Sequence, residues 1–291
     1  ACDTNPAHLV AAATEFEFLQ VSSAMCDEYA ATLANQLSEQ GIIAYYPIHD
    51  SEIGAASAGR AAFEARNITL LAPPDEAIFI VRDKLRMAGV FMSAGVPSPP
   101  TSRLDHVTWE DTPLHVKPRA GVGSHGATAV CDAAEFAKLQ SRDNANTMIA
   151  QPFVKGDEIT IDALCPAPGT VQAIACRQRV EVKAGVSTKA RIFSDSAFYD
   201  LTAQVSATID LTGSFCYQVR GTARAGWQVI DVNPRIGGGT AMSVAVGLDF
   251  PTAHAAYFLG HDTSACFKTL PKEDVFVTRS YREHVAWLAN R

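Results

Sequence analysis

The stretch from Trp227 to Gly239 constrains the fold of this chain more than any other part of its sequence. Its first six residues alternate as the two faces of a strand do and are rich in residues that favour strands. Alternate strand residues point to the same face, so a carboxylate, an amide and a guanidinium project together from Asp231, Asn233 and Arg235. A proline then ends the strand, and three glycines let another segment or a ligand approach the backbone.

The chemistry of these three side chains has two interpretations. Carboxylate and amide oxygens suit a hard Mg²⁺ ion, and a guanidinium suits the phosphates that such an ion carries. The alternative is a polar strand end that runs into a glycine-rich turn. The matching features upstream favour the first interpretation.

Composition excludes several classes of protein. The chain has 291 residues, enough for two domains, and with 47% hydrophobic and 19% charged residues it can bury a sizeable core. A net charge of −7 argues against general nucleic-acid binding, which requires a basic face. No apolar run reaches the roughly 18 residues that a membrane span needs.

The seven cysteines are scattered, with no CxxC pair and no Cys/His cluster. This pattern is typical of reduced, mostly buried cysteines and predicts a cytoplasmic protein without a disulfide framework or zinc site. The first residue is Ala1 and not Met, which is compatible with a processed product or a fragment.

Residues 1–72 alternate between predicted strands and helices. The strands are expected at 15–21, 42–46 and 68–71, and the helices at 25–39 and 52–66. This alternation predicts a parallel sheet with right-handed crossovers. His49 and Asp50 follow a strand end, where open α/β sheets bind ligands, but capping of the next helix explains them equally well.

A glycine-rich hairpin is expected in the next part of the chain. Residues 82–94 read as a helix that carries Lys84, and His115 to Pro118 as a strand that carries Lys117. The segment Gly121–Gly126 and a partner strand at 127–131 complete the hairpin. Glycine backbone N–H groups can bind phosphate oxygens, and a nearby lysine adds charge. The segment is not a P-loop, and a plain surface loop is the alternative.

Two further strands are predicted at 147–154 and 158–164. Backbone groups of Gln151 to Val154 could meet an adenine edge and Glu158 could hold ribose hydroxyls, or both could be ordinary strand polarity. Residues 183–191 are expected to form a basic loop for an anionic substrate. A strand at 214–220 should pair with 227–232 and place Gln218 near Asp231 as a second oxygen ligand. Helices are expected at 197–209, 238–246 and 249–259.

The order and spacing of these features resemble the ATP-grasp superfamily. The features are Lys84, Lys117–Pro118, the Gly121–Gly126 segment, Gln151 to Val154, Glu158, Gln218 and Asp231 to Arg235. The chain resembles the carbamoyl-phosphate-synthase-like branch and the related carboxylate–amine ligases over nearly its whole length. The resemblance implies an α/β protein with an ATP-grasp fold preceded by a small Rossmann-like parallel-sheet domain. It divides the chain into residues 1–72, which lack the first strand of that domain, a small lid subdomain at 73–154 and a large metal-binding subdomain at 155–291.

The resemblance also implies roles for site residues. ATP and Mg²⁺ (or Mn²⁺) are the implied cofactors. Lys84 and Lys117 are implied to contact ATP, with Lys117 also catalytic, and Gly123, Ser124 and Gly126 to close over the triphosphate. Gln151, Phe153 and Val154 are implied to line the adenine edge, and Glu158 to bind the ribose. The implied metal ligands are Gln218, Asp231 and Asn233, and Arg235 is implied to steady the transferring phosphoryl group. Two positions depart from the family pattern, since Asp231 stands where Glu is common and Gln151 where Glu is frequent.

The implied activity is that of an ADP-forming ligase. ATP converts a carboxylate to an acyl phosphate, and an amine, or less commonly a thiol, displaces the phosphate. The expected partners are therefore small-molecule carboxylates and amines, amino acids among them. No nucleic acid or membrane partner is expected, and a homodimer is compatible with the resemblance. Two alternatives stay open: a carbamoyl-phosphate-synthase-like kinase acting on bicarbonate or carbamate, and a regulatory module that binds ATP without turnover.

Overall fold

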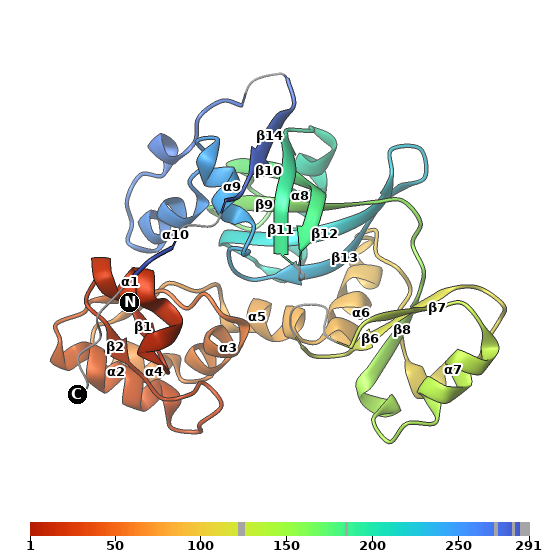
Figure 1. The fold of residues 1–291 in the computed structure, drawn as a ribbon, viewed down its shortest axis with the longest axis horizontal. Helices are drawn as coiled ribbons and strands as arrows, with labels where there is room; N and C mark the ends of the chain where they lie inside the picture. The colour runs from red at the N-terminus through yellow and green to blue at the C-terminus, as the bar shows by residue number, and fades with distance from the viewer. Residues whose placement is uncertain (122–125, 184–185, 271–272, 281–282, 286–291) are drawn as a thin grey trace. The chain divides into compact units, whose positions relative to one another are not determined.

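The computed structural model describes residues 1–291 except 122–125, 184–185, 271–272, 281–282 and 286–291 (Figure 1). The chain divides into two compact units, Ala1–Leu71 with Arg279–Arg291, and Ala72–Thr278. Both units mix helices and strands, as predicted. No helix within the described ranges combines the length and apolarity that crossing a bilayer would require.

Within its described residues, the first unit contains two short parallel strand pairs and five helices. Strand β1 (Cys2–Asp3) pairs with β2 (Leu19–Gln20), and β3 (Ala44–Tyr45) pairs with β4 (Thr69–Leu70). The helices are η1 (Pro6–Leu9), α1 (Val10–Glu15), α2 (Tyr29–Glu39), α3 (Asp50–Ala58) and α4 (Arg60–Glu64). The parallel pairing agrees with the prediction, although each strand is only two residues long. The N-terminal segment, expected to follow a first strand, itself contains β1.

The helix predicted over residues 52–66 is wrong as a single element, because it is divided at Gly59. A Cβ at Gly59 would lie 2.2 Å from the Cβ of Ala30 on α2, so glycine allows close packing of this corner against α2. The core beside it holds Tyr45 and Phe63, whose rings stack at 5.6 Å, and Tyr29, whose hydroxyl lies 2.8 Å from that of Tyr45. Asp50, in the first turn of α3, follows the N-cap His49.

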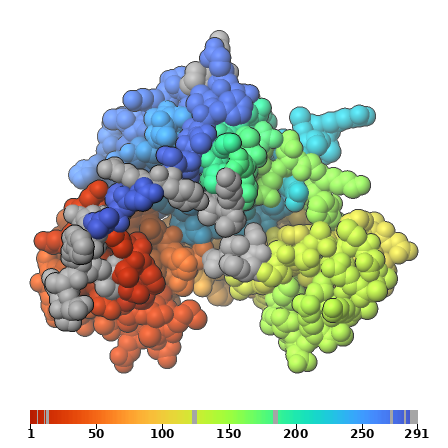
Figure 2. All heavy atoms as spheres, viewed as in Figure 1, coloured from red at the N-terminus to blue at the C-terminus, as the bar shows by residue number. Residues whose placement is uncertain are grey.

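The second unit begins with a small lobe built on a four-stranded antiparallel sheet. Its strand order is β5 (Ser102–Arg103), β8 (Met148–Pro152), β6 (Leu114–Pro118) and β7 (Thr128–Val130). The N-cap of helix α7 (Ala133–Gln140) is Asp132, whose carboxylate accepts from the Glu135 backbone N–H at 2.8 Å. Val116, Phe136 and Leu139 bury together between helix and sheet. The space-filling view shows this lobe as a distinct yellow-to-green mass (Figure 2).

The rest of the second unit is built on a six-stranded antiparallel sheet. Its order is β13 (Gly226–Asn233), β12 (Gly213–Thr222), β9 (Asp157–Cys165), β10 (Ala173–Lys183), β11 (Val186–Phe193) and β14 (Val275–Thr278). The basic loop predicted over residues 183–191 is wrong, because β11 runs through most of it. Ala190 and Ile192 are buried in the core, while Lys189 and Arg191 alternate with them and pair with Glu181 and Asp274.

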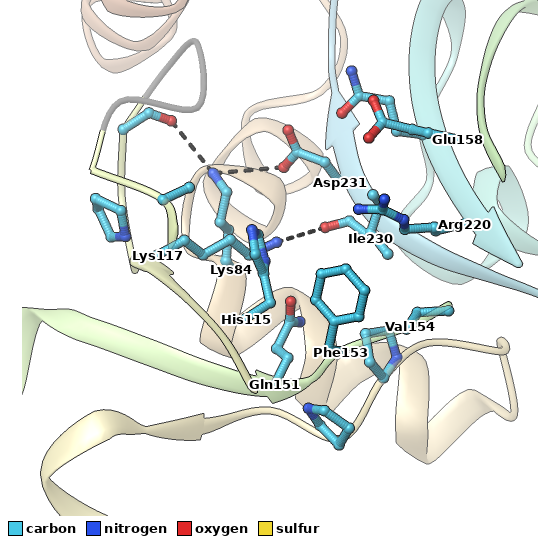
Figure 3. A pocket seen from close by; sticks show the side chains of 16 residues that line it. Lys84, His115, Lys117, Gln151, Phe153, Val154, Glu158, Arg220, Ile230 and Asp231 are labelled. Carbon is cyan, nitrogen blue, oxygen red and sulfur yellow. Dashed lines mark hydrogen bonds and ion pairs between the residues drawn. The ribbon is translucent and has the colours of Figure 1, made fainter. Parts of the chain in front are cut away.

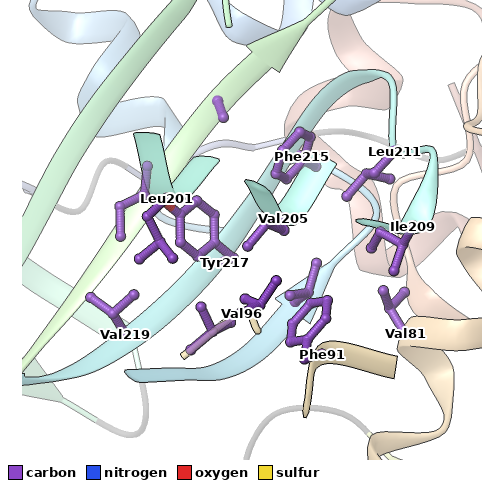
Figure 4. Packing of buried hydrophobic residues seen from close by; sticks show 14 of the residues in the cluster. Val81, Phe91, Val96, Leu201, Val205, Ile209, Leu211, Phe215, Tyr217 and Val219 are labelled. Atoms are coloured by element: carbon purple, nitrogen blue, oxygen red, sulfur yellow. The ribbon is translucent and has the colours of Figure 1, made fainter. Parts of the chain in front are cut away.

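Helices cover both faces of this sheet. Helices α5 (Asp75–Arg82), α6 (Lys84–Ala94) and α8 (Ala197–Ile209) pack on one face in a cluster that includes Phe91, Val205 and Tyr217 (Figure 4). Helices α9 (Thr240–Ala245) and α10 (Phe250–Phe258) pack on the other. Helix α6 begins at Lys84 and not at residue 82, because the Asp83 carboxylate caps it by accepting from Leu85 and Arg86 N–H groups.

We expect Phe91→Ala to lower the free energy of unfolding by about 3–5 kcal/mol, because the ring is fully buried and its removal leaves a cavity. The neighbouring Met92 is 73% exposed on the same helix, so Met92→Ala should change stability by no more than about 0.5 kcal/mol. Urea unfolding of both variants measures the difference. Equal losses would contradict the packing assigned to α6.

Candidate functional site

A pocket in the second unit gathers side chains from the four-stranded and six-stranded sheets and from the start of α6 (Figure 3). Lysines and one carboxylate lie at one end, and an aromatic ring lies at the other. Of the predicted site residues, those that line the pocket are Lys84, Lys117, Gln151, Phe153, Val154, Glu158, Gln218 and Asp231. Gly121 also lines it.

Lys84 occupies the charged end of the pocket. Its Nζ lies 3.5 Å from Asp231 Oδ1 and donates to the Gly121 carbonyl at 3.3 Å. The preceding Asp83 pairs with Arg119, and the Lys84 backbone N–H donates to the Arg119 carbonyl at 3.0 Å. These contacts join the start of α6, which carries Lys84, to the end of β6, which carries Lys117. The two lysines of the pocket are therefore positioned by the same set of contacts.

Lys117 joins the two sheets. Its ammonium is buried and donates to the Ile230 carbonyl of β13 at 2.9 Å. Burial lowers the pKa of Lys117 to about 8, the charge of Asp231 opposes that shift, and the charge of Lys84 adds to it. The lysine therefore stays mostly charged at neutral pH, with the carboxylates of Asp231 and Glu158 both favouring its charged form.

The other end of the pocket combines Phe153 with two side chains that the sequence analysis missed. The Arg220 guanidinium lies 5.0 Å from the centre of the Phe153 ring, within cation–π range. His115 stands directly opposite Gln151 in the β6–β8 register. Burial lowers the pKa of His115 to about 4, helped by the charges of Lys117 and Arg220, so the imidazole is neutral at physiological pH. The period of two along each strand could have identified both, since His115 precedes Lys117, and Arg220 follows Gln218, by two residues.

The predicted strand pairing between Gln218 and Asp231 is confirmed, because the two residues are direct partners in the antiparallel β12–β13 ladder. Asn233 and Arg235 follow on the same chain but do not line the pocket. Arg235 donates to the Ile236 carbonyl at 3.0 Å and approaches Asn233 Oδ1 at 3.5 Å.

The remaining predicted residues have separate outcomes. Gln151 is buried and donates from Nε2 to Thr101 Oγ1 at 2.8 Å, and Glu158 Oε1 lies 3.7 Å from Arg179 Nη1. Gly126 adopts a φ of 75° and does not line the pocket. Gly123 and Ser124 lie outside the described residues, so the expectation that they close over phosphates stays a prediction.

The pocket offers few metal ligands of its own. Over the described part of the chain, no group of three or more His, Cys, Asp and Glu side chains gathers as a metal site. Asp231 with the amide of Gln218 nevertheless fits Mg²⁺, which commonly takes one or two carboxylates together with substrate phosphates. These residues are therefore suited to an ion that a polyphosphate ligand carries in.

A buried polar cluster behind the Gly237–Gly239 turn was also missed. It consists of Asp162 on β9 and Arg177 on β10 with Thr240 and Ser243 of α9. No local pattern marks the pair, because residues 15 positions apart meet only through the β9–β10 ladder.

We expect the Lys117 ammonium to titrate near pH 8, and Asp231→Asn to lower that pKa further by removing an attractive charge. Unfolding between about pH 8 and the usual 10.5 takes up a proton, so the contribution of Lys117 to stability should rise with pH there. NMR of ¹³Cε-labelled lysine, assigned with Lys117→Met, measures the pKa. A parent value near 10.5, or a rise in Asp231→Asn, would contradict the assigned burial and pairing.

Comparison with known proteins agrees with this architecture. Residues 144–279 match the family model described as ATP-grasp in the biosynthetic pathway with Ter operon. No curated protein sequence matches the chain. The structure resembles an L-amino acid ligase from Bacillus licheniformis with a TM-score of 0.64 and 18% identity, covering 83% of this chain and 62% of that one.

Two other solved structures give similar results. The biotin carboxylase domain of the Hydrogenobacter thermophilus 2-oxoglutarate carboxylase has a TM-score of 0.70 and 15% identity, covering 90% of this chain and 64% of that one. N5-carboxyaminoimidazole synthetase from Staphylococcus aureus has a TM-score of 0.68 and 14% identity, and the match covers 94% of this chain and 72% of that one. The chain thus spans less than two thirds of the length of the ligase and of the carboxylase domain. The protein has the ATP-grasp fold, and its residues 144–279 carry the match to an ATP-grasp family.

Proposed function

We propose that this protein is an ATP-dependent ligase that activates a carboxylate as an acyl phosphate and joins it to an amine. The observation that carries the proposal is the convergence of Lys84, Lys117 and the Gln218–Asp231 strand pair on one pocket. Two cations beside a carboxylate, with an aromatic ring at the other end, suit a nucleotide whose phosphates are charged and whose base is flat.

In the proposed complex, the ATP phosphates lie between Lys84 and Lys117, and the base lies toward Phe153. The Phe153 N–H already donates to the Pro113 carbonyl at 2.9 Å, so we assign the backbone donor for the adenine edge to Val154. Glu158 lines the same pocket and would accept from the ribose hydroxyls. In this scheme residues 73–154 act as the lid over the nucleotide and residues 155–291 supply the metal ligands.

Bound Mg²⁺ or Mn²⁺ would neutralise phosphate charge, held by Asp231, Gln218 and Asn233 together with the phosphates themselves. Lys84 would then exchange its contact with Asp231 for a phosphate oxygen. Lys117 stays charged at neutral pH and would stabilise the negative charge that accumulates on the phosphate oxygens during transfer.

The proposed reaction has two steps. A carboxylate oxygen attacks the γ-phosphorus, the bond to the β-phosphate oxygen breaks, and ADP leaves. The amine nitrogen then attacks the acyl carbon and inorganic phosphate departs with the bonding pair, while the amine loses a proton. Arg235 would steady the transferring phosphoryl group, since phosphoryl transfer depends mostly on positioning and electrostatic stabilisation. Amino acids are the leading substrate candidates because the L-amino acid ligase shares this fold. The free state of the described cysteines is compatible with the cytoplasm, where small-molecule acids and amines are available.

A second candidate is a nucleotide-binding module without turnover. The short Asp231 side chain stands where a longer Glu is common in the family, and it is already paired with Lys84 at 3.5 Å. Both features weaken the case for a competent metal site. The decisive difference between the candidates is whether ADP forms.

We expect sustained ADP formation from ATP and Mg²⁺ only when both an acid and an amine are supplied, because the acid alone supports the first step but not release of the acyl group to an amine. Coupled measurement of ADP and phosphate with pooled amino acids, other carboxylates and bicarbonate tests this and separates a bicarbonate kinase from a ligase. Nucleotide binding with no ADP under any pool would instead support the non-catalytic module.

Asp231→Asn should lower turnover on the order of a hundredfold or more while weakening nucleotide binding less, because charge stabilisation matters most during transfer. Gln218→Ala should act on the same ion, so the double variant should cost less than the sum of the single changes. Asp143→Asn, an exposed carboxylate elsewhere in the chain, is the matched control and should keep parent turnover. Parent-like turnover in Asp231→Asn, with folding verified by thermal melting, would remove Asp231 from the metal site.

A further inference from the structure

The Gly237–Gly239 turn is backed by a buried ion pair with an unusually complete set of partners. Asp162 and Arg177 are 1% and 4% exposed. Arg177 donates to both carboxylate oxygens of Asp162, from Nε at 2.7 Å and from Nη2 at 2.9 Å. Thr240 and Ser243 hydroxyls donate to the same carboxylate at 2.8 and 2.6 Å. Each carboxylate oxygen of Asp162 thus accepts two donors, one from Arg177 and one from a hydroxyl.

Thr240 connects this pair to the turn. Its hydroxyl donates its proton to Asp162 and accepts from the Gly237 backbone N–H at 2.9 Å. The single proton of the hydroxyl is thus used for the carboxylate, and one of its lone pairs accepts from the turn. The position of the Gly237 amide is thereby set by Asp162, which lies on β9 of the central sheet.

Steric contact fixes the other end of the turn. A Cβ at Gly239 would lie 1.9 Å from Arg177 Nη1, and one at Gly237 would lie 3.0 Å from the Cys216 sulfur. The absence of side chains therefore lets the turn lie directly on the guanidinium of Arg177 and on β12. This close approach explains two of the three glycines, while a Cβ at Gly238 would meet nothing within 4 Å among the described residues.

Arg235 lies just before the Gly237–Gly239 turn in the chain. Gly237 follows Arg235 by two residues, and Arg235 donates to the intervening Ile236 carbonyl at 3.0 Å. Cys216, which touches the turn, is also the register partner of Asn233. A path thus runs through hydrogen bonds from Asp162 to the Thr240 hydroxyl and the Gly237 amide, and from Gly237 along two residues of backbone to Arg235.

We infer that Asp162, Arg177 and Thr240 form a positioning unit that sets where Arg235 stands relative to Asp231. This inference rests on the proposed function, in which Arg235 contacts the transferring phosphoryl group. None of the three residues lines the nucleotide pocket. Disturbing the unit should therefore impair transfer while leaving nucleotide binding intact.

Thr240→Val is the sharpest test, because it keeps the side-chain shape and the Asp162–Arg177 pair but removes the hydroxyl between Asp162 and Gly237. We expect kcat for ADP formation to fall on the order of tenfold to a hundredfold, as for other small misplacements remote from the chemistry. The KM for ATP and the affinity for ADP should stay within about twofold of the parent. Thr240→Ser keeps the hydroxyl and should restore most of the activity.

Ser243→Ala is the matched control, since it removes the other hydroxyl bonded to Asp162 without touching the turn. It should lower the melting temperature about as much as Thr240→Val but keep parent kcat. Equal kcat losses in both variants would overturn the inference, because the cluster would then act only through stability. A parent-like kcat in Thr240→Val would overturn it as well.

NMR supplies a readout that does not depend on activity. In Thr240→Val, and not in Ser243→Ala, the Gly237 amide should lose exchange protection and the ¹⁵Nε signal of Arg235 should shift. If the parent forms no ADP with any acid, the proposed function fails, and these two signals alone decide whether the unit positions Arg235. Unchanged signals in Thr240→Val would overturn the inference in either case.

Discussion

The hydrogen bond from Lys117 Nζ to the Ile230 carbonyl is the contact on which the pocket depends, because it bridges the two sheets of the second unit. Burying an ammonium is costly, and the depressed pKa of Lys117 records that cost. The carbonyl of β13 and the charge of Asp231 offset it. The lysine therefore stays charged at neutral pH although its ammonium is buried between the two sheets.

The β12–β13 ladder explains why the polar residues converge. Pairing Gln218 with Asp231 brings two oxygen donors from separate strands to one place, and the period of two puts Arg220 further along the same wall. His115, Lys117 and Gln151 repeat the arrangement on the opposite sheet. Each wall is thus a short polar row on a strand whose other face is in the core.

The pocket and the Gly237–Gly239 turn have different supports. The hydrogen bond from Lys117 to the Ile230 carbonyl supports the pocket, whereas the buried Asp162–Arg177 pair and the Thr240 hydroxyl support the turn. A buried ion pair is a weak source of stability, since desolvation offsets much of its attraction. Its complete set of partners favours a role in specifying geometry. We therefore expect mutations of the two supports to have different effects on the pocket and on the turn.

The sequence by itself determined the elements whose periodicity is strong and local. Alternation along residues 214–220 and 227–232 predicted two strands, their pairing and the meeting of Gln218 with Asp231, and the structure has all three. The basic residues at 183–191 did not indicate a loop, because a strand with one buried face can carry Lys189 and Arg191 on the other. Only the tertiary structure brought His115 and Arg220, from strands of different sheets, to one pocket and joined Asp162 to Arg177 behind the Gly237–Gly239 turn. Their roles depend on which strands become neighbours, and neighbouring strands bring together residues far apart in sequence that no local pattern relates.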